Sequence, residues 1–373
     1  MKGIALYIHV PFCKQKCLYC DFPSFSGKEE LMAEYAEALS KEIENVPKRK
    51  INTIFIGGGT PTYLCLEGWK IIKSSIDKLC KSDDLEFTIE ANPGTLDKEK
   101  LIFFKEMGVN RISMGLQASQ DSLLKSLGRI HNLEQFKESF KMARECGFDN
   151  INVDIMFGLP GQSLEDLKET LEKVIALKPE HISCYSLIVE EGTPFYKLYE
   201  EERLSLPDED LEREMYKSAV DTLQGEGYLQ YEISNFSKVG RECKHNIVYW
   251  SLEEYIGCGS GAHSYFEGKR YSNEQQIVNY IERLKRMNSA VVEEYVNTSK
   301  DDMEEFMFMG LRKVEGISEE EFFSRFKVNI NSVYGKVIDK YVKQELCIRS
   351  NGRIFLSSRG IEISNTIMAD FII

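Results

Sequence analysis

The chain has 373 residues, 42% of them hydrophobic, and a formal net charge of −13 at pH 7. This length predicts one large domain with a smaller second one, and the apolar content is enough for a buried core. The acidic charge argues against nucleic acid as a partner, because a phosphate backbone attracts basic surfaces. No segment reaches the roughly 18 apolar residues of a membrane span and no secretory leader is evident, so we expect a cytoplasmic protein without a transmembrane segment.

Short apolar runs rich in β-branched residues recur along the first half of the chain. They predict six strands, at 5–10, 53–59, 86–93, 111–117, 151–160 and 181–189. Charged segments with helical periodicity lie between them, and strands that alternate with helices form parallel sheets. Six such units predict a partial (β/α)6 barrel of the TIM type, with its site at the carboxyl ends of the strands. A doubly wound sheet is the alternative, since a sequence does not reveal closure.

The alternation stops after about residue 235. From residue 300 onward, three helical patterns precede a predicted hairpin whose turn is Asn351-Gly352. This order is similar to a winged helix, but the similar numbers of basic and acidic residues argue against a DNA-binding wing. We therefore expect a barrel domain (1–235), a connecting region that contains the segment HNIVYW (236–299), and a C-terminal winged-helix-like cap of class α+β (300–373).

Three cysteines, Cys13, Cys17 and Cys20, follow the first predicted strand within eight positions. Disulfides are not expected in an acidic chain of a reducing compartment. Thiolates at this spacing on one loop can converge on a soft metal centre. Zinc would need a fourth protein ligand, and no suitable partner motif lies nearby. A four-iron cluster held by three cysteines instead leaves one iron open for another ligand.

The segment CKQKCLYC resembles the C-x3-C-x2-C motif of radical S-adenosylmethionine (SAM) enzymes. That resemblance implies a partial barrel of six β/α units, a [4Fe-4S] cluster on the three cysteines, and SAM bound at the open iron, where the family cleaves it to a radical. The segment GGGTPT one unit later is similar to the glycine-rich SAM-binding segment of the family. It implies SAM contacts for Gly58, Gly59 and Thr60.

Polar residues near the ends of later strands resemble a narrower branch, the oxygen-independent coproporphyrinogen III oxidases and their relatives. The branch also shows the segment YIHVPFC found here at 7–13. By this resemblance Glu90, Gln117, Arg129 and Asp154 would hold the SAM ribose and carboxylate, or a second SAM. Tyr7 would lie against the cluster and SAM.

Phe22 stands where the oxidases proper carry a fourth cysteine, two positions after the third. The segment CDF is typical of the sister group, the heme chaperones, and implies a place for Phe22 beside the cofactors. The segment CKHNIVYW resembles the HNxxYW motif of the same group and implies that His245 binds heme. Imidazole is a common axial ligand of heme iron, although a lone histidine among aromatics is by itself more often structural. His263, in a glycine-rich stretch, is a candidate for the same cavity.

The sequence thus predicts a heme chaperone on a radical SAM scaffold, with a [4Fe-4S] cluster, SAM and heme as its bound groups. Its partner would be a heme-accepting apoprotein, such as a membrane-associated respiratory protein. The alternative is an enzyme that decarboxylates coproporphyrinogen III to protoporphyrinogen IX, against which Phe22 and the short N-terminus argue. A nucleic-acid-modifying radical SAM enzyme is disfavoured by the acidic charge.

Overall fold

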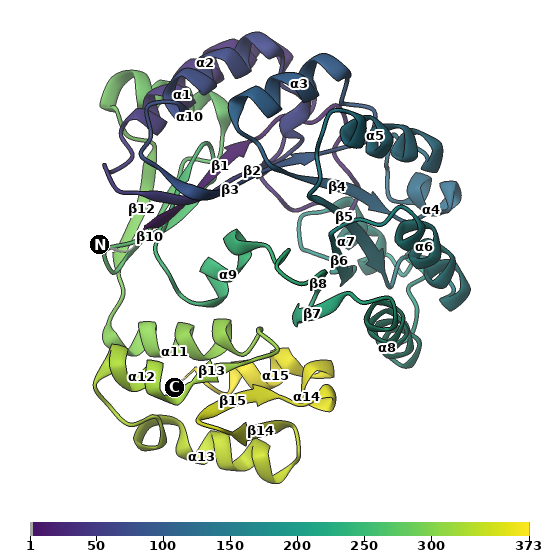
Figure 1. The fold of residues 1–373 in the computed structure, drawn as a ribbon, viewed down its shortest axis with the longest axis vertical. Coiled ribbons are helices and arrows are strands. Elements are labelled where there is room, and N and C mark those ends of the chain that lie inside the picture. Colours follow the sequence, from purple (N-terminus) through teal and green to yellow (C-terminus); the bar gives the residue numbers. More distant parts are fainter. Residues whose placement is uncertain (1–2, 373) are drawn as a thin grey trace.

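A single curved sheet runs through most of the molecule, with helices over its outer face (Figure 1). This computed structural model describes residues 3–372. The sheet has 12 strands in the order β12-β11-β10-β9-β1-β2-β3-β4-β5-β6-β8-β7. Six parallel strands form its centre: β1 (Ile4–Val10), β2 (Ile51–Gly58), β3 (Lys81–Ala91), β4 (Arg111–Gln117), β5 (Ile151–Phe157) and β6 (His181–Ser186). The terminal strands β12 and β7 do not pair, so the barrel is partial.

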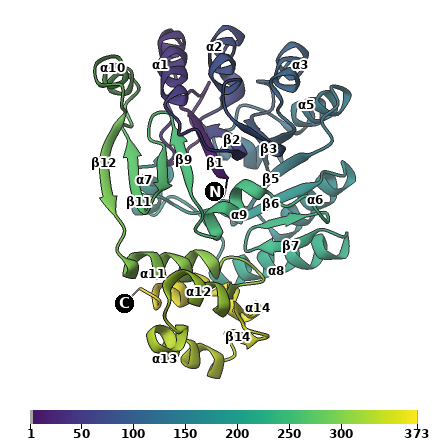
Figure 2. The same ribbon diagram turned by 60° about the vertical axis from the view of Figure 1, so that its left-hand side comes forward.

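The outer face of the sheet is covered by helices that follow the strands in sequence (Figure 2). Most of the core lies between these two layers. The helices of this part are α1 (Met32–Glu44), α2 (Leu66–Ile76), α3 (Lys98–Met107), α4 (Asp121–Ser126), α5 (Leu133–Glu145), α6 (Leu164–Ala176), α7 (Pro194–Glu200), α8 (Glu209–Gly225) and α10 (Ile277–Met287), with short 3-10 turns at Glu29–Leu31 and Pro61–Tyr63. No described helix is long and apolar enough to cross a membrane.

Alternation along β1 shows how the sequence separates core from lumen. Leu6, Ile8 and Val10 point outward and are fully buried against the helices. Tyr7 and His9 point the other way and line a cavity. Successive strand residues face opposite sides, so the run ALYIHV builds the core with one face and a polar, aromatic interior with the other.

The segment that we expected to connect the two domains also extends the sheet. β9 (Tyr255–Cys258) pairs in parallel with β1, and the antiparallel strands β10 (His263–Phe266), β11 (Lys269–Asn273) and β12 (Val291–Val296) follow it. At the opposite end of the sheet, β7 (Leu229–Glu232) and β8 (Asn235–Ser237) pair beyond β6. Helix α9 (Lys244–Trp250), which holds the HNIVYW segment, lies on the inner side of the sheet (Figure 1).

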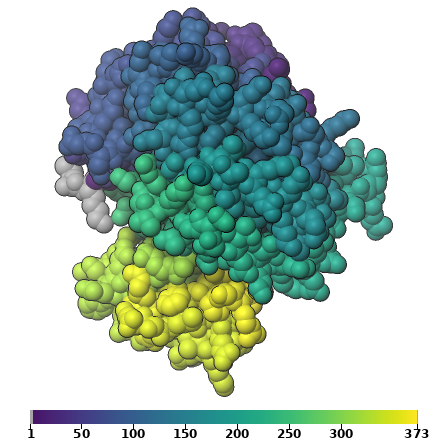
Figure 3. Space-filling model, turned by 45° about the vertical axis from the view of Figure 1, so that its right-hand side comes forward, coloured from purple at the N-terminus to yellow at the C-terminus, as the bar shows by residue number. Residues whose placement is uncertain are grey.

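The last part of the chain forms a second lobe, yellow-green to yellow in Figure 3, and its core also takes in Leu252 and Tyr265 from the preceding region. Its elements are α11 (Ser299–Gly310), β13 (Ile317–Ser318), α12 (Glu319–Phe326), α13 (Ile330–Lys343), β14 (Cys347–Ser350), β15 (Arg353–Leu356), α14 (Ser358–Glu362) and α15 (Ser364–Ala369). The predicted hairpin is present: Asn351 and Gly352 both have positive φ, of 51° and 70°, as a tight two-residue turn requires. The expected class, a partial parallel β/α barrel followed by a small α+β domain, is confirmed.

Candidate functional site

The three clustered cysteines lie on the loop that follows β1, at the carboxyl edge of the parallel strands. The loop folds back on itself: the Cys13 N–H donates to the Phe25 carbonyl at 2.9 Å, and the Phe25 N–H donates to the Pro11 carbonyl at 2.7 Å. All three thiols are free; Cys13 is buried, and Cys17 and Cys20 are partly exposed. No three candidate ligands among the described residues converge closely enough for a single metal ion.

A cavity of about 150 Å³ adjoins this loop and brings most of the predicted residues together. It is lined by residues from the cysteine loop, from β2 to β6 and from the segment that follows α4. Those predicted from the sequence are Cys13, Cys17, Cys20, Phe22, Gly58, Gly59, Thr60, Glu90, Gln117, Arg129 and Asp154. The carboxyl ends of parallel strands share one edge, which is why residues more than 140 positions apart meet here. Tyr7 and His245 line a second cavity instead.

Close backbone approach explains the glycines after β2. A Cβ at Gly59 would lie 2.8 Å from the Phe12 carbonyl oxygen and 3.0 Å from Cys13 Sγ. Gly58 has φ of +114°, and its N–H donates to Glu90 Oε2 at 3.2 Å. Thr60 Oγ1 lies 3.7 Å from Cys13 Sγ. A side chain at Gly59 would push the cysteine loop away from β2, whereas one at Gly58 would meet the His9 ring and be strained by the positive φ.

The carboxyl groups in this region are held in an environment that favours their neutral form. Burial, followed by the nearby Asp154 charge, raises the pKa of Glu90 to about 8. Burial also raises the pKa of Asp154, although Asn152 Nδ2 donates to it at 2.8 Å. Arg129 supplies the positive charge, with Nη2 donating to Asn92 Oδ1 at 2.7 Å and Nη1 lying 3.5 Å from Cys17 Sγ.

Gln117 carries an unsatisfied acceptor at the end of β4. It is a non-glycine residue with φ of 70°, and its buried side-chain Oε1 accepts no hydrogen bond from the described part of the chain. Backbone strain and an orphaned polar atom cost free energy, and both persist mainly where they serve a ligand. A hydroxyl or amino group bound in the smaller cavity would satisfy this oxygen.

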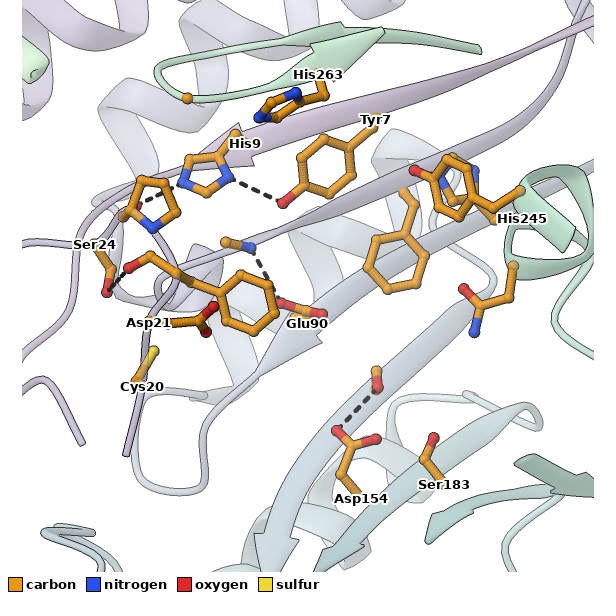
Figure 4. Close-up of a pocket in the computed structure, with 18 of the residues that line it drawn as sticks. Tyr7, His9, Cys20, Asp21, Ser24, Glu90, Asp154, Ser183, His245 and His263 are labelled. Atoms are coloured by element: carbon orange, nitrogen blue, oxygen red, sulfur yellow. Dashed lines mark hydrogen bonds between the residues drawn. The ribbon is translucent and has the colours of Figure 1, made fainter. Parts of the chain in front are cut away.

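A larger cavity of about 1200 Å³ occupies the barrel interior and reaches Cys20 (Figure 4). Its aromatic walls include Tyr7, Phe55, Tyr249, Trp250 and Tyr255. In Figure 4, Tyr7, His9 and His263 lie along one side, Asp154 and Ser183 along the opposite side, and His245 at the end away from Cys20. The two cavities share Cys20, Phe22, Gly58, Glu90 and Asp154 in their walls. A large, flat, apolar ligand would fit here, next to whatever occupies the cysteine loop.

His245 is buried and fully hydrogen-bonded. Its Nδ1 lies 2.8 Å from Thr53 Oγ1, and its Nε2 lies 2.8 Å from the Tyr249 hydroxyl. Its backbone N–H donates to Glu86 Oε1 at 3.0 Å, which ties α9 to β3. Burial lowers the pKa of His245 to about 3, so the ring is neutral at physiological pH. A metal could reach Nε2 once the Tyr249 hydroxyl moves away.

The other histidines of the cavity differ in what their rings contact. His9 Nδ1 lies 3.0 Å from the Tyr7 hydroxyl and its Nε2 lies 2.8 Å from the Pro23 carbonyl. His263 is exposed to the cavity, and its ring forms no hydrogen bond with a residue between 3 and 372. His263 therefore offers a free imidazole, which the glycine-rich segment GCGSGAHSY alone could not establish.

Comparisons with known proteins identify the scaffold. Residues 7–174 match the Radical SAM superfamily, and residues 297–363 match the HemN C-terminal domain. The chain is 40% identical to the heme chaperone HemW of Bacillus subtilis, over 98% of both chains. It is 38% identical to HemW of Lactococcus lactis, over all of this chain and 98% of the relative. The chain belongs to the HemW family.

Among solved structures, coproporphyrinogen III oxidase (HemN) from Escherichia coli is similar over 99% of this chain and 90% of that chain. The TM-score is 0.87 at 20% identity, so this likeness concerns the fold alone. Membership of the HemW family confirms the resemblance inferred from CKQKCLYC, CDF and HNIVYW. Phe22, on which the choice between the two sister groups depended, lines both cavities and is 60% exposed.

One residue of the larger cavity escaped the sequence analysis. Arg111 opens β4 in the run RISMGLQ, lines the cavity, and is only 2% exposed. The available signal was a single charge at the start of an otherwise uncharged strand. It was overlooked because a charge at a strand end is usually solvated.

Proposed function

We propose that this chain is a heme chaperone, which binds heme in the larger cavity and passes it to an acceptor protein. The observation that carries the proposal is an aromatic cavity of about 1200 Å³ in the barrel interior, open to the cysteine loop. Its volume suits a macrocycle, and flat side chains supply the apolar area that a porphyrin needs. Full-length relatives at 38% and 40% identity are heme chaperones by name.

We propose that Cys13, Cys17 and Cys20 hold a [4Fe-4S] cluster and that SAM binds beside it in the smaller cavity. The free thiols, the unsatisfied Gln117 Oε1 and the glycine cradle at 58–59 fit these groups. The residues proposed to contact SAM are Tyr7, Phe22, Gly58, Gly59, Thr60, Glu90, Gln117, Arg129 and Asp154. When bound, the cluster and SAM supply one-electron chemistry. The chain's own part is to orient SAM and to keep Glu90 protonated near neutral pH.

For the heme iron we propose His245 as the axial ligand. Its ring is neutral because burial lowers its pKa to about 3, so no proton competes for the nitrogen. Ligation through Nε2 requires the Tyr249 hydroxyl to give up its 2.8 Å contact. His263 is the competing ligand, favoured by its free ring in the same cavity.

We propose a cytoplasmic location, which rests on the sequence pattern, and a membrane-associated respiratory protein as the heme acceptor, which rests on the family resemblance. Decarboxylation of coproporphyrinogen III is the alternative activity. Phe22 disfavours it, because a phenyl ring cannot replace the thiol that the oxidases carry at this position.

An anaerobic heme titration of the cluster-reconstituted protein tests the proposal. Followed by Soret absorption, the wild type should saturate at one heme per chain. His245→Ala should weaken binding and shift the Soret band, whereas His263→Ala should do neither. If His263→Ala gives the change and His245→Ala does not, the ligand is His263. If heme binding does not saturate in the wild type or in either variant, and the protein converts coproporphyrinogen III to protoporphyrinogen IX, the protein is a decarboxylase and the chaperone proposal is wrong.

A further inference from the structure

Arg111 is a buried guanidinium whose side chain touches no carboxylate directly, although, against the effect of burial, the charges of Glu86 and Asp154 help to raise its pKa. It forms no ion pair within 4.0 Å and no hydrogen bond with another described residue, and its Nε is buried without a partner. The other two arginines that line the cavities, Arg270 and Arg129, both donate hydrogen bonds to protein groups. Arg270 forms a two-point contact with Glu305 at 2.7 and 2.6 Å, and Arg129 donates to Asn92 Oδ1 and the Gly115 carbonyl.

The two carboxylates whose charges act on Arg111, Glu86 and Asp154, form their hydrogen bonds with other groups. Glu86 accepts from the backbone N–H groups of Lys244 and His245, at 2.9 and 3.0 Å, and so fixes the start of α9. Asp154 accepts from Asn152 Nδ2 at 2.8 Å. A guanidinium stays charged at every physiological pH, and these carboxylates act on Arg111 without contacting it, so its buried Nε–H has no acceptor, which costs free energy. An acidic group from outside the chain would remove that cost.

The place of Arg111 in the barrel limits what this group can belong to. Arg111 is the first residue of β4, and Gln117, at the cluster cavity, is the last; six residues of strand span about 20 Å. Arg111 therefore lies at the end of the larger cavity remote from the cysteines. Asn246 of α9 also lines the cavity. The pKa of His245 is lowered mainly by burial and, to a smaller extent, by the positive charge of Arg111.

We propose that Arg111 binds a propionate carboxylate of the heme at the end of the larger cavity remote from the cluster. The inference rests on the proposed function, because it assigns an orientation to the heme of that same site. The porphyrin would turn its propionate edge to Arg111 and lay its apolar faces against the aromatic walls. A guanidinium presents two parallel N–H donors to a carboxylate, which gives this contact its geometry. Because Arg111 lies near His245, the same placement brings the iron toward the proposed ligand.

The experiment compares protoheme with its dimethyl ester, in which both propionates are neutral. Wild-type protein, reconstituted with its cluster, should bind the ester about 10- to 100-fold more weakly than the free acid, the range for charge-assisted hydrogen bonds. Arg111→Gln should weaken the binding of protoheme by a similar factor. In that variant the dimethyl ester should bind almost as well as the free acid. Arg111→Lys, which keeps the charge, should recover part of the loss. In the control Arg270→Gln, the ratio between acid and ester should stay at the wild-type value, because Glu305 occupies that guanidinium.

Two results would contradict the inference about Arg111 without contradicting the proposed chaperone function. One is equal affinity of the wild type for acid and ester, a comparison that needs no variant to fold. The other is a loss in Arg111→Gln that is the same for both ligands, which would make Arg111 structural. Failure of the wild type to bind either ligand would overturn the proposed function and the inference with it.

Discussion

Replacing Tyr249 with Phe should raise the affinity for heme while lowering the stability of the empty protein. The Tyr249 hydroxyl lies 2.8 Å from His245 Nε2, the atom that would face the iron. Ligation through Nε2 requires the tautomer that carries its proton on Nδ1, directed at Thr53 Oγ1, and in that tautomer the hydroxyl and the iron compete for one lone pair. A buried hydrogen bond of this kind is worth about 0.5–1.5 kcal/mol net. Removing it in advance should therefore tighten heme binding about 2- to 10-fold.

The same change leaves Nε2 buried without a partner in the empty protein, at a cost of about 1–3 kcal/mol of unfolding free energy. Phe keeps the ring that packs edge-on against Tyr255, 4.6 Å between centroids, so no cavity opens. Soret titration and urea unfolding measure the two effects. Thr53→Val is the matched control: it loses the contact that orients the ring and should weaken heme binding. Heme affinity that falls or stays constant in Tyr249→Phe would refute ligation by Nε2 and direct attention to His263.

Three further predictions concern the cluster side of the barrel. Replacing Cys13, Cys17 or Cys20 with Ala should abolish cluster assembly, measured as bound iron and acid-labile sulfide, whereas Ala at the exposed Cys65 or Cys80 should not. Gly59→Ala should impair assembly without removing a ligand, because its Cβ would meet the cysteine loop; Gly225→Ala, with nothing within 4 Å, is its control. The raised pKa of Glu90, about 8 against 4.5 in the unfolded chain, means that the unfolded state loses its proton first and that stability falls between pH 4.5 and 8. Glu90→Gln should flatten this fall in urea unfolding of the cluster-free protein at pH 5 and 8; an unchanged slope would place the titration elsewhere.

Local chemistry made much of the scaffold predictable. The six central strands follow from apolar β-branched runs, and all six lie within a few residues of their expected bounds except at the start of β3. The C-terminal hairpin follows from Asn351-Gly352, two residues that tolerate positive φ. Glu90 and Gln117 lie at or next to the carboxyl ends of β3 and β4, so parallel strand order places them at one edge, whereas Asp154 lies within β5 and its place in the site followed from the family resemblance.

Contacts between distant parts of the chain explain what the sequence did not reveal. Strand β11, KRYSN, is too polar to be recognised as a strand, and it forms because the flanking strands β10 and β12 complete its hydrogen bonds. The two ring contacts of His245 combine a local partner, Tyr249, with Thr53, which is 192 positions away. The exposure of a residue such as Arg111 depends on which side chains close around it, and no periodicity encodes that.

The shared wall of the two cavities bears on why Phe22 stands at its position. Phe22 lines both cavities, together with Cys20 and Glu90. A thiol there would place a second redox-active sulfur between the cluster loop and the large cavity. The phenyl ring is inert and extends the aromatic wall toward the cysteines. In a site that must hold a redox-active macrocycle and release it unchanged, an inert residue between ligand and cluster has an advantage that it would not have in a decarboxylase. The geometry of the cavity therefore offers a physical reason for phenylalanine at position 22, the residue by which the sequence distinguishes the two sister groups.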